Sequence, residues 1–434
     1  MALLLKGGRL IDPALGLDRV ADIVIRDGII VEVGTDKETL IIPKGDMIDC
    51  TGCVITPGLV DMHVHLREPG YEYKEDLASG GRAAAAGGFT TLLAMPNTNP
   101  VIDTGSRVLA IQEAAHQATR TRIKIAGSLT SGQKGEALSE MGDMVKAGAI
   151  AFTDDGHGVQ DSGLMRRVMA YAQQFGVPVL SHCEDEQLAG DGVINEGKAS
   201  TRLGLSGYPP LAEELQISRD IALAELTGCA LHIQHLTTAR GAALIRDAKQ
   251  KGLAVSCEVT PHHLFLNEDD LDETYNSNLK VNPPLRTAQD CEALQEALIE
   301  GVIDCMASDH APHARHEKAL EFEIAPFGTT GLETALALLI TRLVRPGRLS
   351  WDTLVERMSH APRRILNLAP VRLEPGSVAD ITVIDADKPW TVLADGFESK
   401  SNNSAFLGCE LFGKARHVFV DGYATLQDGI TKGI

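Results

Sequence analysis

Short apolar runs alternate with longer amphipathic stretches through the middle of the chain. The apolar runs predict buried strands, and stretches with apolar residues at every third or fourth position predict helices. We expect strands at 54–64, 89–95, 122–128, 149–153, 177–181, 230–235, 253–259 and 302–308. We expect helices at 75–86, 106–119, 136–147, 162–175, 211–227, 239–251, 288–300 and 330–344. Eight strands, each followed by a helix, predict an α/β fold of the (β/α)8 TIM-like barrel type.

The main alternative is a doubly wound open sheet. Such a sheet would place a glycine-rich phosphate-binding turn after an early strand. The glycines at 87 and 88 instead follow an alanine run at 83–86, which is typical of a helix that ends in a C-cap. The pattern therefore favours the barrel.

The two ends of the chain have a different pattern. Residues 1–53 and 366–434 contain short strand-like runs, and the Asp-Gly pairs at 27–28 and 421–422 are typical of hairpin turns. Neither end is long enough to bury a full core alone, so we expect the two ends to form one small β-sandwich. The barrel then spans residues 54–365.

Charge and hydropathy exclude several classes of partner. The chain has 40 Lys and Arg against 59 Asp and Glu, a formal net charge of -19, and no basic block offsets it. A nucleic-acid or anionic-membrane partner is therefore not expected. The chain also shows no secretory leader pattern and no apolar run of membrane-spanning length, so we expect a cytoplasmic protein.

Histidines and aspartates stand where the predicted strands end. His63 and His65 occupy alternate positions of the first strand, so both imidazoles point to the same side. The ends of barrel strands meet at one mouth, where active sites lie. Six candidate metal ligands should meet there: His63, His65, Asp155, His182, His235 and Asp309.

The number of these ligands indicates two metal ions. A mononuclear catalytic zinc usually has three protein ligands and one water. Six ligands suit two ions that are bridged by a carboxylate and a hydroxide, whose formation the two cations favour near neutral pH. Asp309, beside that hydroxide, is a candidate general acid and base. Nitrogen and oxygen ligands admit zinc, cobalt or manganese.

Five motifs resemble those of dihydroorotases of the type I bacterial group, in the amidohydrolase superfamily. The resemblance runs nearly from end to end, and its motifs lie at 63–70, 95–100, 154–156, 282–286 and 308–313. It implies the reversible cyclisation of N-carbamoyl-L-aspartate to L-dihydroorotate and water, in de novo pyrimidine (UMP) synthesis.

The resemblance also implies residue roles. One zinc ion would be held by His63, His65, Asp155 and Asp309, and the other by Asp155, His182 and His235. The substrate would contact His65, Arg67, Asn97, Asn282, His313 and the backbone at Phe327 and Gly328. An Arg fork suits the substrate carboxylate, and Asn side chains suit its ring amides.

One departure concerns the bridging ligand. Hydantoinases and other dihydroorotases bridge their metals with a carbamylated lysine on the fourth strand. Here no lysine lies between Lys146 and Lys198, and the fourth strand ends in Asp154 and Asp155. We expect Asp155 to bridge and Asp154 to turn away as a cap or turn residue.

Other polar residues near the strand ends have structural interpretations. His232 has an odd offset from His235, so it should face away and pack. His262 is expected to be structural, whereas His263 is a candidate for the pocket wall. The three acidic residues Asp161, Glu184 and Asp185 are expected to cap helices.

Two further functions stay open from the sequence. One is another cyclic amidase, such as an allantoinase or a hydantoinase. The other is a non-catalytic, dihydroorotase-like subunit that scaffolds a carbamoyltransferase. A homodimer is expected, and aspartate carbamoyltransferase is a candidate partner.

Overall fold

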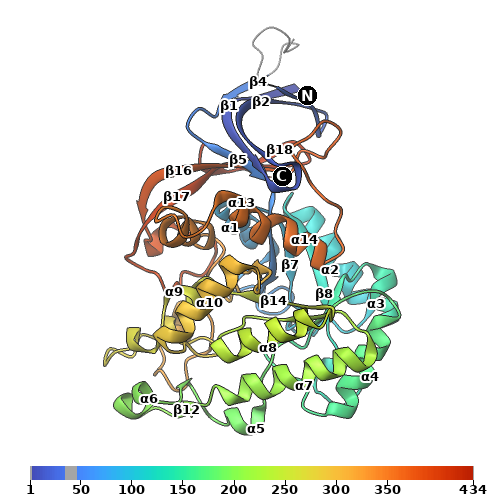
Figure 1. Cartoon of the computed structure of the whole chain (residues 1–434), viewed down its shortest axis with the longest axis vertical. Helices are drawn as coiled ribbons and strands as arrows, with labels where there is room; N and C mark the ends of the chain where they lie inside the picture. Colours follow the sequence, from blue (N-terminus) through green and yellow to red (C-terminus); the bar gives the residue numbers. More distant parts are fainter. Residues whose placement is uncertain (1, 35–45, 434) are drawn as a thin grey trace.

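The computed structural model describes residues 2–34 and 46–433, and its centre is a barrel of eight parallel strands (Figure 1). The strands pair in chain order: β6 (Leu59–Val64), β7 (Phe89–Ala94), β8 (Arg122–Gly127), β9 (Ala151–Phe152), β10 (Val179–Ser181), β13 (Leu231–Ile233), β14 (Val255–Val259) and β15 (Cys305–Met306). The two edges nearly close, because His65 N–H donates to the His310 carbonyl at 2.9 Å. The predicted fold class is confirmed.

Helices surround the barrel where the sequence predicts them. The main ones are α1 (Leu77–Gly87), α2 (Gly105–Ala118), α3 (Met141–Ala147), α4 (Ser162–Gln173), α7 (Leu211–Thr227), α8 (Ala239–Gln250) and α10 (Ala288–Glu300). The eighth begins late, as α12 (Ala335–Leu339), and continues as a π-helical turn to Val344. Asp76 caps α1 through its side chain, and Gly88 ends it with a φ of 92°.

Smaller elements fill the connections. They are α5 (Glu186–Ala189), β11 (Ile194–Asn195), α6 (Lys198–Leu203), β12 (Gly207–Tyr208), α9 (Pro261–Phe265), α11 (Arg315–Lys318), α13 (Trp351–Val355) and α14 (Ala361–Ile365). Within the described ranges, every helix is too short or too polar to cross a membrane.

The apolar run at 54–64 is two strands, so the prediction of a single strand is wrong. Its first part, β5 (Val54–Pro57), pairs with strands of the two chain ends, and only β6 belongs to the barrel. The chain changes sheets at Gly58, where a Cβ atom would lie 2.3 Å from the Thr90 hydroxyl. Both strands are buried, so hydrophobicity alone gave no sign of the break.

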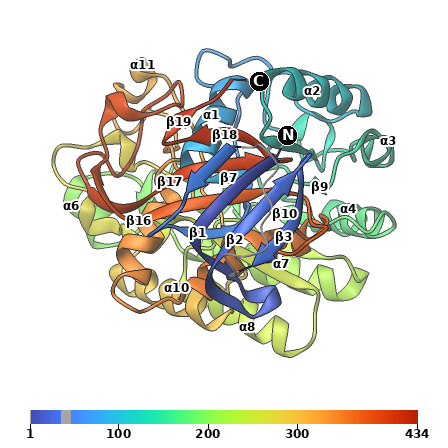
Figure 2. The same cartoon turned by 90° about the horizontal axis from the view of Figure 1, so that it is seen from above.

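Both chain ends build one β domain above the barrel, as expected (Figures 1 and 2). Its other strands are β1 (Ala2–Asp12), β2 (Leu17–Arg26), β3 (Ile29–Gly34), β4 (Asp46–Asp49), β16 (Ile381–Thr391), β17 (Glu410–Val420), β18 (Tyr423–Gln427) and β19 (Ile430–Thr431). Hydrogen bonds join these strands and β5 into one mostly antiparallel sheet. Leu5, Ile55 and Ile381 belong to its shared core.

The predicted hairpin turns are present in this domain. Asp27-Gly28 joins β2 to β3, and Asp421-Gly422 joins β17 to β18, with positive φ at all four residues. Two consecutive positive φ angles match the twist of a tight antiparallel hairpin.

Candidate metal centre and substrate pocket

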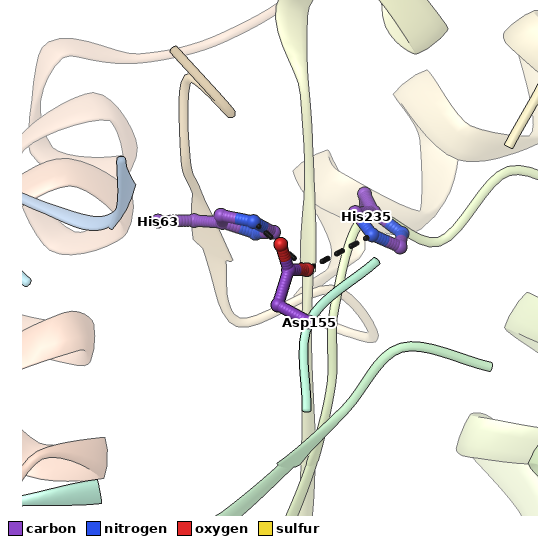
Figure 3. Close-up of side chains that lie close together, drawn as sticks. All are labelled: His63, Asp155 and His235. Carbon is purple, nitrogen blue, oxygen red and sulfur yellow. Dashed lines mark ion pairs between the residues drawn. The ribbon is translucent and has the colours of Figure 1, made fainter. Parts of the chain in front are cut away.

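The six predicted metal ligands lie together and buried at the C-terminal ends of the barrel strands. Asp155 stands among the histidines. Its Oδ1 atom lies 3.2 Å from Nε2 of His63, 3.7 Å from Nε2 of His235 and 3.8 Å from Nδ1 of His182. Figure 3 shows this carboxylate between His63 and His235. Asp155 therefore faces ligands from three different strands.

The other oxygen of Asp155 faces a second group. Its Oδ2 atom lies 3.3 Å from Nε2 of His65. The same His65 nitrogen lies 3.1 Å from Oδ1 of Asp309, which is also 3.5 Å from Nε2 of His63. One carboxylate thus stands between two clusters of ligands, which is the arrangement that a bridging ligand needs.

The histidine rings are held so that one nitrogen faces this centre. The opposite nitrogens contact oxygen acceptors: Nδ1 of His63 lies 2.6 Å from Glu258, Nδ1 of His65 lies 2.9 Å from the Asn97 carbonyl oxygen, and Nε2 of His182 lies 2.9 Å from Glu184. A carboxylate or carbonyl oxygen only accepts, so these nitrogens carry the proton. The lone pairs on the other nitrogens then point toward Asp155, as in metal-binding histidines.

A divalent cation fits this donor set. Oδ1 of Asp155 is buried without a hydrogen bond from a described residue, although three imidazole nitrogens surround it. Nδ1 of His182 and Nε2 of His235 lie only 2.9 Å apart. Buried polar atoms without partners are costly, and a shared cation would satisfy all of them.

Electrostatics keeps the carboxylates ionised. Burial alone would raise the pKa of Asp309, but the neighbouring imidazoles of His63 and His65 lower it well below its ordinary value. Burial is likewise outweighed at Glu258, where His63 and His232 lower the pKa to about 2. These groups are therefore available as anions near neutral pH.

A cavity of 210 Å³ opens directly beside the centre. All the predicted substrate-contact residues line it: His65, Arg67, Asn97, Asn282, His313, Phe327 and Gly328. The guanidinium of Arg67 donates from Nε to the Pro312 carbonyl at 3.1 Å, and its Nη2 atom lies 3.2 Å from the His313 ring. A cationic group thus stands at the wall of a pocket that also contains amide groups.

Comparison with known proteins identifies the family. Dihydroorotase from Geobacter metallireducens is 49% identical over 97% of this chain and 99% of its own length. Dihydroorotase from Acetivibrio thermocellus is 45% identical over 99% of this chain and 100% of its own. The chain belongs to the dihydroorotase family. A sequence model described as "Dihydro-orotase-like" matches residues 52–240.

Solved structures place the dihydroorotase family beside cyclic amidases. L-hydantoinase (dihydropyrimidinase) from Arthrobacter aurescens is 27% identical and superposes with a TM-score of 0.89 over 99% of this chain and 97% of its own. Among the residues that the structure describes, those that line the cavity include Asp155 and no lysine. An enzyme of the cyclic amidohydrolase type is thus indicated by family and fold together.

Several expectations about neighbouring residues are confirmed. Asp154 turns away and accepts hydrogen bonds from the backbone N–H groups of Leu129 and Thr130 at 2.8 and 3.1 Å. Asp161 and Asp185 cap helices α4 and α5. His232 is fully buried and packs with its nitrogens near Ser256 and Glu258.

Two expectations are wrong. Glu184 is not a helix cap, because its carboxylate contacts His182 and accepts from Nδ2 of Asn282 at 2.8 Å. His263 does not line the cavity, because its ring lies against Thr260 and, at 2.8 Å, the Pro283 carbonyl. Residue spacing placed both residues near the mouth but did not define where each side chain points: Glu184 lies in a loop and His263 in the short helix α9.

Glu258 is a residue that sequence reasoning missed. It is fully buried in β14 and contacts both His63 and His232. A single acid within the apolar run at 253–259 was the available signal. Buried carboxylates are rare unless they have partners, so such a residue predicts a buried cation or imidazole nearby.

Three site residues have backbone conformations that are unusual for side-chain-bearing residues. Arg67, His235 and Asp309 have φ angles of 63°, 29° and 45°. Positive φ angles are uncommon in residues other than glycine. They concentrate at functional sites, where the surrounding structure holds the strained backbone in place. Each of the three lies where the chain turns out of a strand into the mouth.

Proposed function

We propose that this protein is a dihydroorotase that interconverts N-carbamoyl-L-aspartate and L-dihydroorotate in pyrimidine synthesis. The observation that carries the proposal is the position of Asp155 between two ligand clusters, beside a cavity with an arginine in its wall. Two zinc ions would be held by the six ligands, with Asp155 as the bridge. When bound, they would polarise the ring carbonyl and lower the pKa of water.

The protein's own residues supply the proton transfer. In ring opening, water attacks the cyclic amide carbonyl and loses a proton, and the ring nitrogen must gain one as the C–N bond breaks. Asp309 is ionised and 3.1 Å from His65, at the edge of the cavity, so it can take the first proton and deliver it to the nitrogen. Ring closure uses the same transfers in reverse.

The other residues of the cavity wall would select the substrate. Arg67 would grip the ring carboxylate, and His313, 3.2 Å from Arg67, would act at the same end. Asn282 has a buried carbonyl oxygen without a partner among the described residues, which suits a ring N–H donor. The amide oxygen of Asn97 already holds His65, so Asn97 would offer the substrate only its amide nitrogen.

The proposal includes the cellular setting. We propose a cytoplasmic enzyme of the type I bacterial group that forms a homodimer and associates with aspartate carbamoyltransferase. Light scattering of the purified protein, alone and with that transcarbamoylase, tests both associations. A monomer that does not bind the transcarbamoylase would contradict this part and leave the reaction unaffected.

A hydantoinase is the second candidate, because solved hydantoinases share the fold. The aspartate bridge and the arginine in the pocket wall favour dihydroorotase. The test is to incubate the zinc-loaded protein with dihydroorotate, hydantoin and allantoin and to follow ring opening. We expect turnover of dihydroorotate alone or far above the others. Preference for hydantoin or allantoin would replace the proposal, and no turnover would favour the non-catalytic subunit.

A further inference from the structure

The segment between β16 and β17 leaves the β domain and reaches the barrel mouth. Four of its polar residues, Ser399, Ser401, Asn403 and Ser404, are buried. The Ser399 hydroxyl contacts the buried Glu75, and the Ser401 hydroxyl donates to the Lys74 carbonyl at 2.7 Å. This segment, residues 399–405, is therefore docked on the barrel beside the pocket, although its neighbours in sequence belong to the β domain.

Asn403 uses both ends of its amide on two different segments of the pocket wall. Its Oδ1 atom accepts from the backbone N–H of His313 at 3.0 Å. Its Nδ2 atom donates to the carbonyl of Ala311 at 3.3 Å and to that of Gly328 at 3.1 Å. This orientation pairs every donor with an acceptor, and a flipped amide would pair none of them.

The backbone of Asn403 extends the same connection. Its carbonyl accepts from the Thr329 hydroxyl at 3.0 Å and from the Thr330 N–H at 3.2 Å. One buried residue thus contacts the chain at 311–313 and again at 328–330. Hydrogen bonds of this kind fix both segments relative to each other, because each unmade bond would leave a buried polar group unsatisfied.

The two connected segments meet at the pocket with little space between them. His313 donates from Nε2 to the Phe327 carbonyl at 2.8 Å. Gly328 has a φ of 133°, and a Cβ atom there would lie 2.8 Å from the Cβ of Ala311. The distance between His313 and Gly328 therefore decides the shape of the wall that faces the substrate.

We infer that Asn403 is a positioning residue that sets the spacing between His313 and Gly328 in the substrate pocket. Asn403 is not among the residues that line the cavity, so it acts through the two that do. The inference rests on the proposed function, because the wall that Asn403 holds is the one assigned to the dihydroorotate carboxylate. Small displacements of a substrate-positioning wall weaken binding and orientation strongly.

The neighbouring Asn402 provides a matched control. Its Nδ2 atom donates to the Ala394 carbonyl at 3.1 Å, and it is not among the residues that line the cavity beside the metal centre. The experiment compares Asn403→Asp with Asn402→Asp in the zinc-loaded enzyme. Each change replaces an amide N–H donor with an oxygen, but only the first places that oxygen against the carbonyls of Ala311 and Gly328.

We expect Asn403→Asp to raise KM for dihydroorotate about tenfold or more, with kcat changed less than KM and with zinc content unchanged. Asn402→Asp should retain the wild-type KM. Equal KM values in the two variants, or a loss confined to kcat, would overturn the inference. If Asn403→Asp does not fold, the alanine variants of both residues are compared instead, and failure of Asn403→Ala alone to fold would assign Asn403 to folding and overturn it.

The experiment distinguishes an error in the proposed function from an error in this inference. Wild-type protein that does not open dihydroorotate would contradict the proposed reaction. Wild-type turnover together with an unaffected Asn403→Asp variant would contradict only the positioning role.

Discussion

Asp309 combines two properties that the proposed proton carrier needs, an ionised carboxylate and a position in the cavity wall. It lines the cavity, lies 3.1 Å from His65, and has a pKa that its imidazole neighbours lower. A φ of 45° turns the chain at this residue and directs it into the mouth. In the proposed function, Asp309 would therefore both help to hold a cation and exchange a proton with the substrate.

Replacement of Asp309 by asparagine should separate these roles. Asparagine keeps an oxygen that can contact a metal but cannot carry the proton, so we expect turnover of dihydroorotate to fall by about two orders of magnitude or more. The measurement is kcat together with zinc content by metal analysis. Near-normal kcat with both metals retained would remove Asp309 from proton transfer.

Arg67 is the residue that should distinguish substrates with a carboxylate. A charge-assisted contact in a partly dehydrated pocket contributes about 1.5–3 kcal/mol, which corresponds to a factor of about ten to a hundred. We expect Arg67→Met to lower kcat/KM for dihydroorotate by that factor and to leave zinc content unchanged. Any hydantoin hydrolysis serves as the control, because hydantoin lacks the carboxylate. Equal losses on both substrates would assign Arg67 to the metal centre or the fold.

At the scale of elements, the short strand β9 positions the central carboxylate. Thr153, the residue after β9, is fixed by two hydrogen bonds. Its N–H donates to the Gly127 carbonyl at 2.9 Å, and its hydroxyl donates to the Gln234 side-chain oxygen at 2.8 Å. Asp154 is then tied to the end of β8. Asp155, the next residue, is left to face the histidines.

The carboxylate that follows β9 belongs to an aspartate and not to a carbamylated lysine. Assembly of the proposed metal centre should therefore not require carbon dioxide. A carbamylated lysine forms only by reaction of the amine with carbon dioxide, whereas Asp155 is a carboxylate already. We expect metal-stripped protein to regain the same activity with zinc in carbonate-free and in bicarbonate-supplemented buffer. A strong requirement for bicarbonate would show that a different group bridges the metals.

At the scale of the whole molecule, the segment between β16 and β17 joins the β domain to the barrel mouth. Glu333, just before α12, accepts from the backbone N–H groups of Glu398 and Ser399 at 3.0 and 3.1 Å. Burial raises the pKa of this carboxyl to about 7, and the charges of Glu398 and Glu75 add to the effect. The contact between this segment and the barrel therefore contains a carboxyl group, that of Glu333, with a pKa near neutral pH.

This group should make part of the stability depend on pH. The folded pKa lies above the ordinary value of 4.5, so between these values the folded protein holds a proton that the unfolded chain releases. The contribution of Glu333 is thus fully present below about pH 4.5 and is lost as the pH rises through about 7. We expect the Tm advantage of the wild type over Glu333→Gln to shrink from pH 5 to pH 8.

The control for this measurement is Glu292→Gln, at an exposed position on α10. Its Tm difference from the wild type should stay constant over the same pH range. A constant difference for Glu333→Gln as well would show that Glu333 does not exchange its proton on unfolding.

Much of this molecule could be predicted from local patterns. The alternation of apolar runs with helical periodicity predicted the barrel, because strands buried on both faces and amphipathic helices leave different repeats. The strand ends then located His63, His182 and Asp309, since parallel strands in a barrel end at one mouth. The motifs carried the resemblance that assigned Arg67 and Asn282.

Other features depended on contacts between distant segments. The break at Gly58, the role of Glu258 behind His63 and the contact of Glu184 with His182 follow from how strands and loops meet in space. Asn403 lies 90 residues from His313, and nothing in its own neighbourhood in the sequence indicates the barrel. The groups at the barrel mouth could be identified from the sequence, because the end of each strand is marked by a local pattern of residues. Which residues hold those groups in place follows from the folded structure, because the partners of a hydrogen bond are neighbours in space and need not be neighbours in sequence.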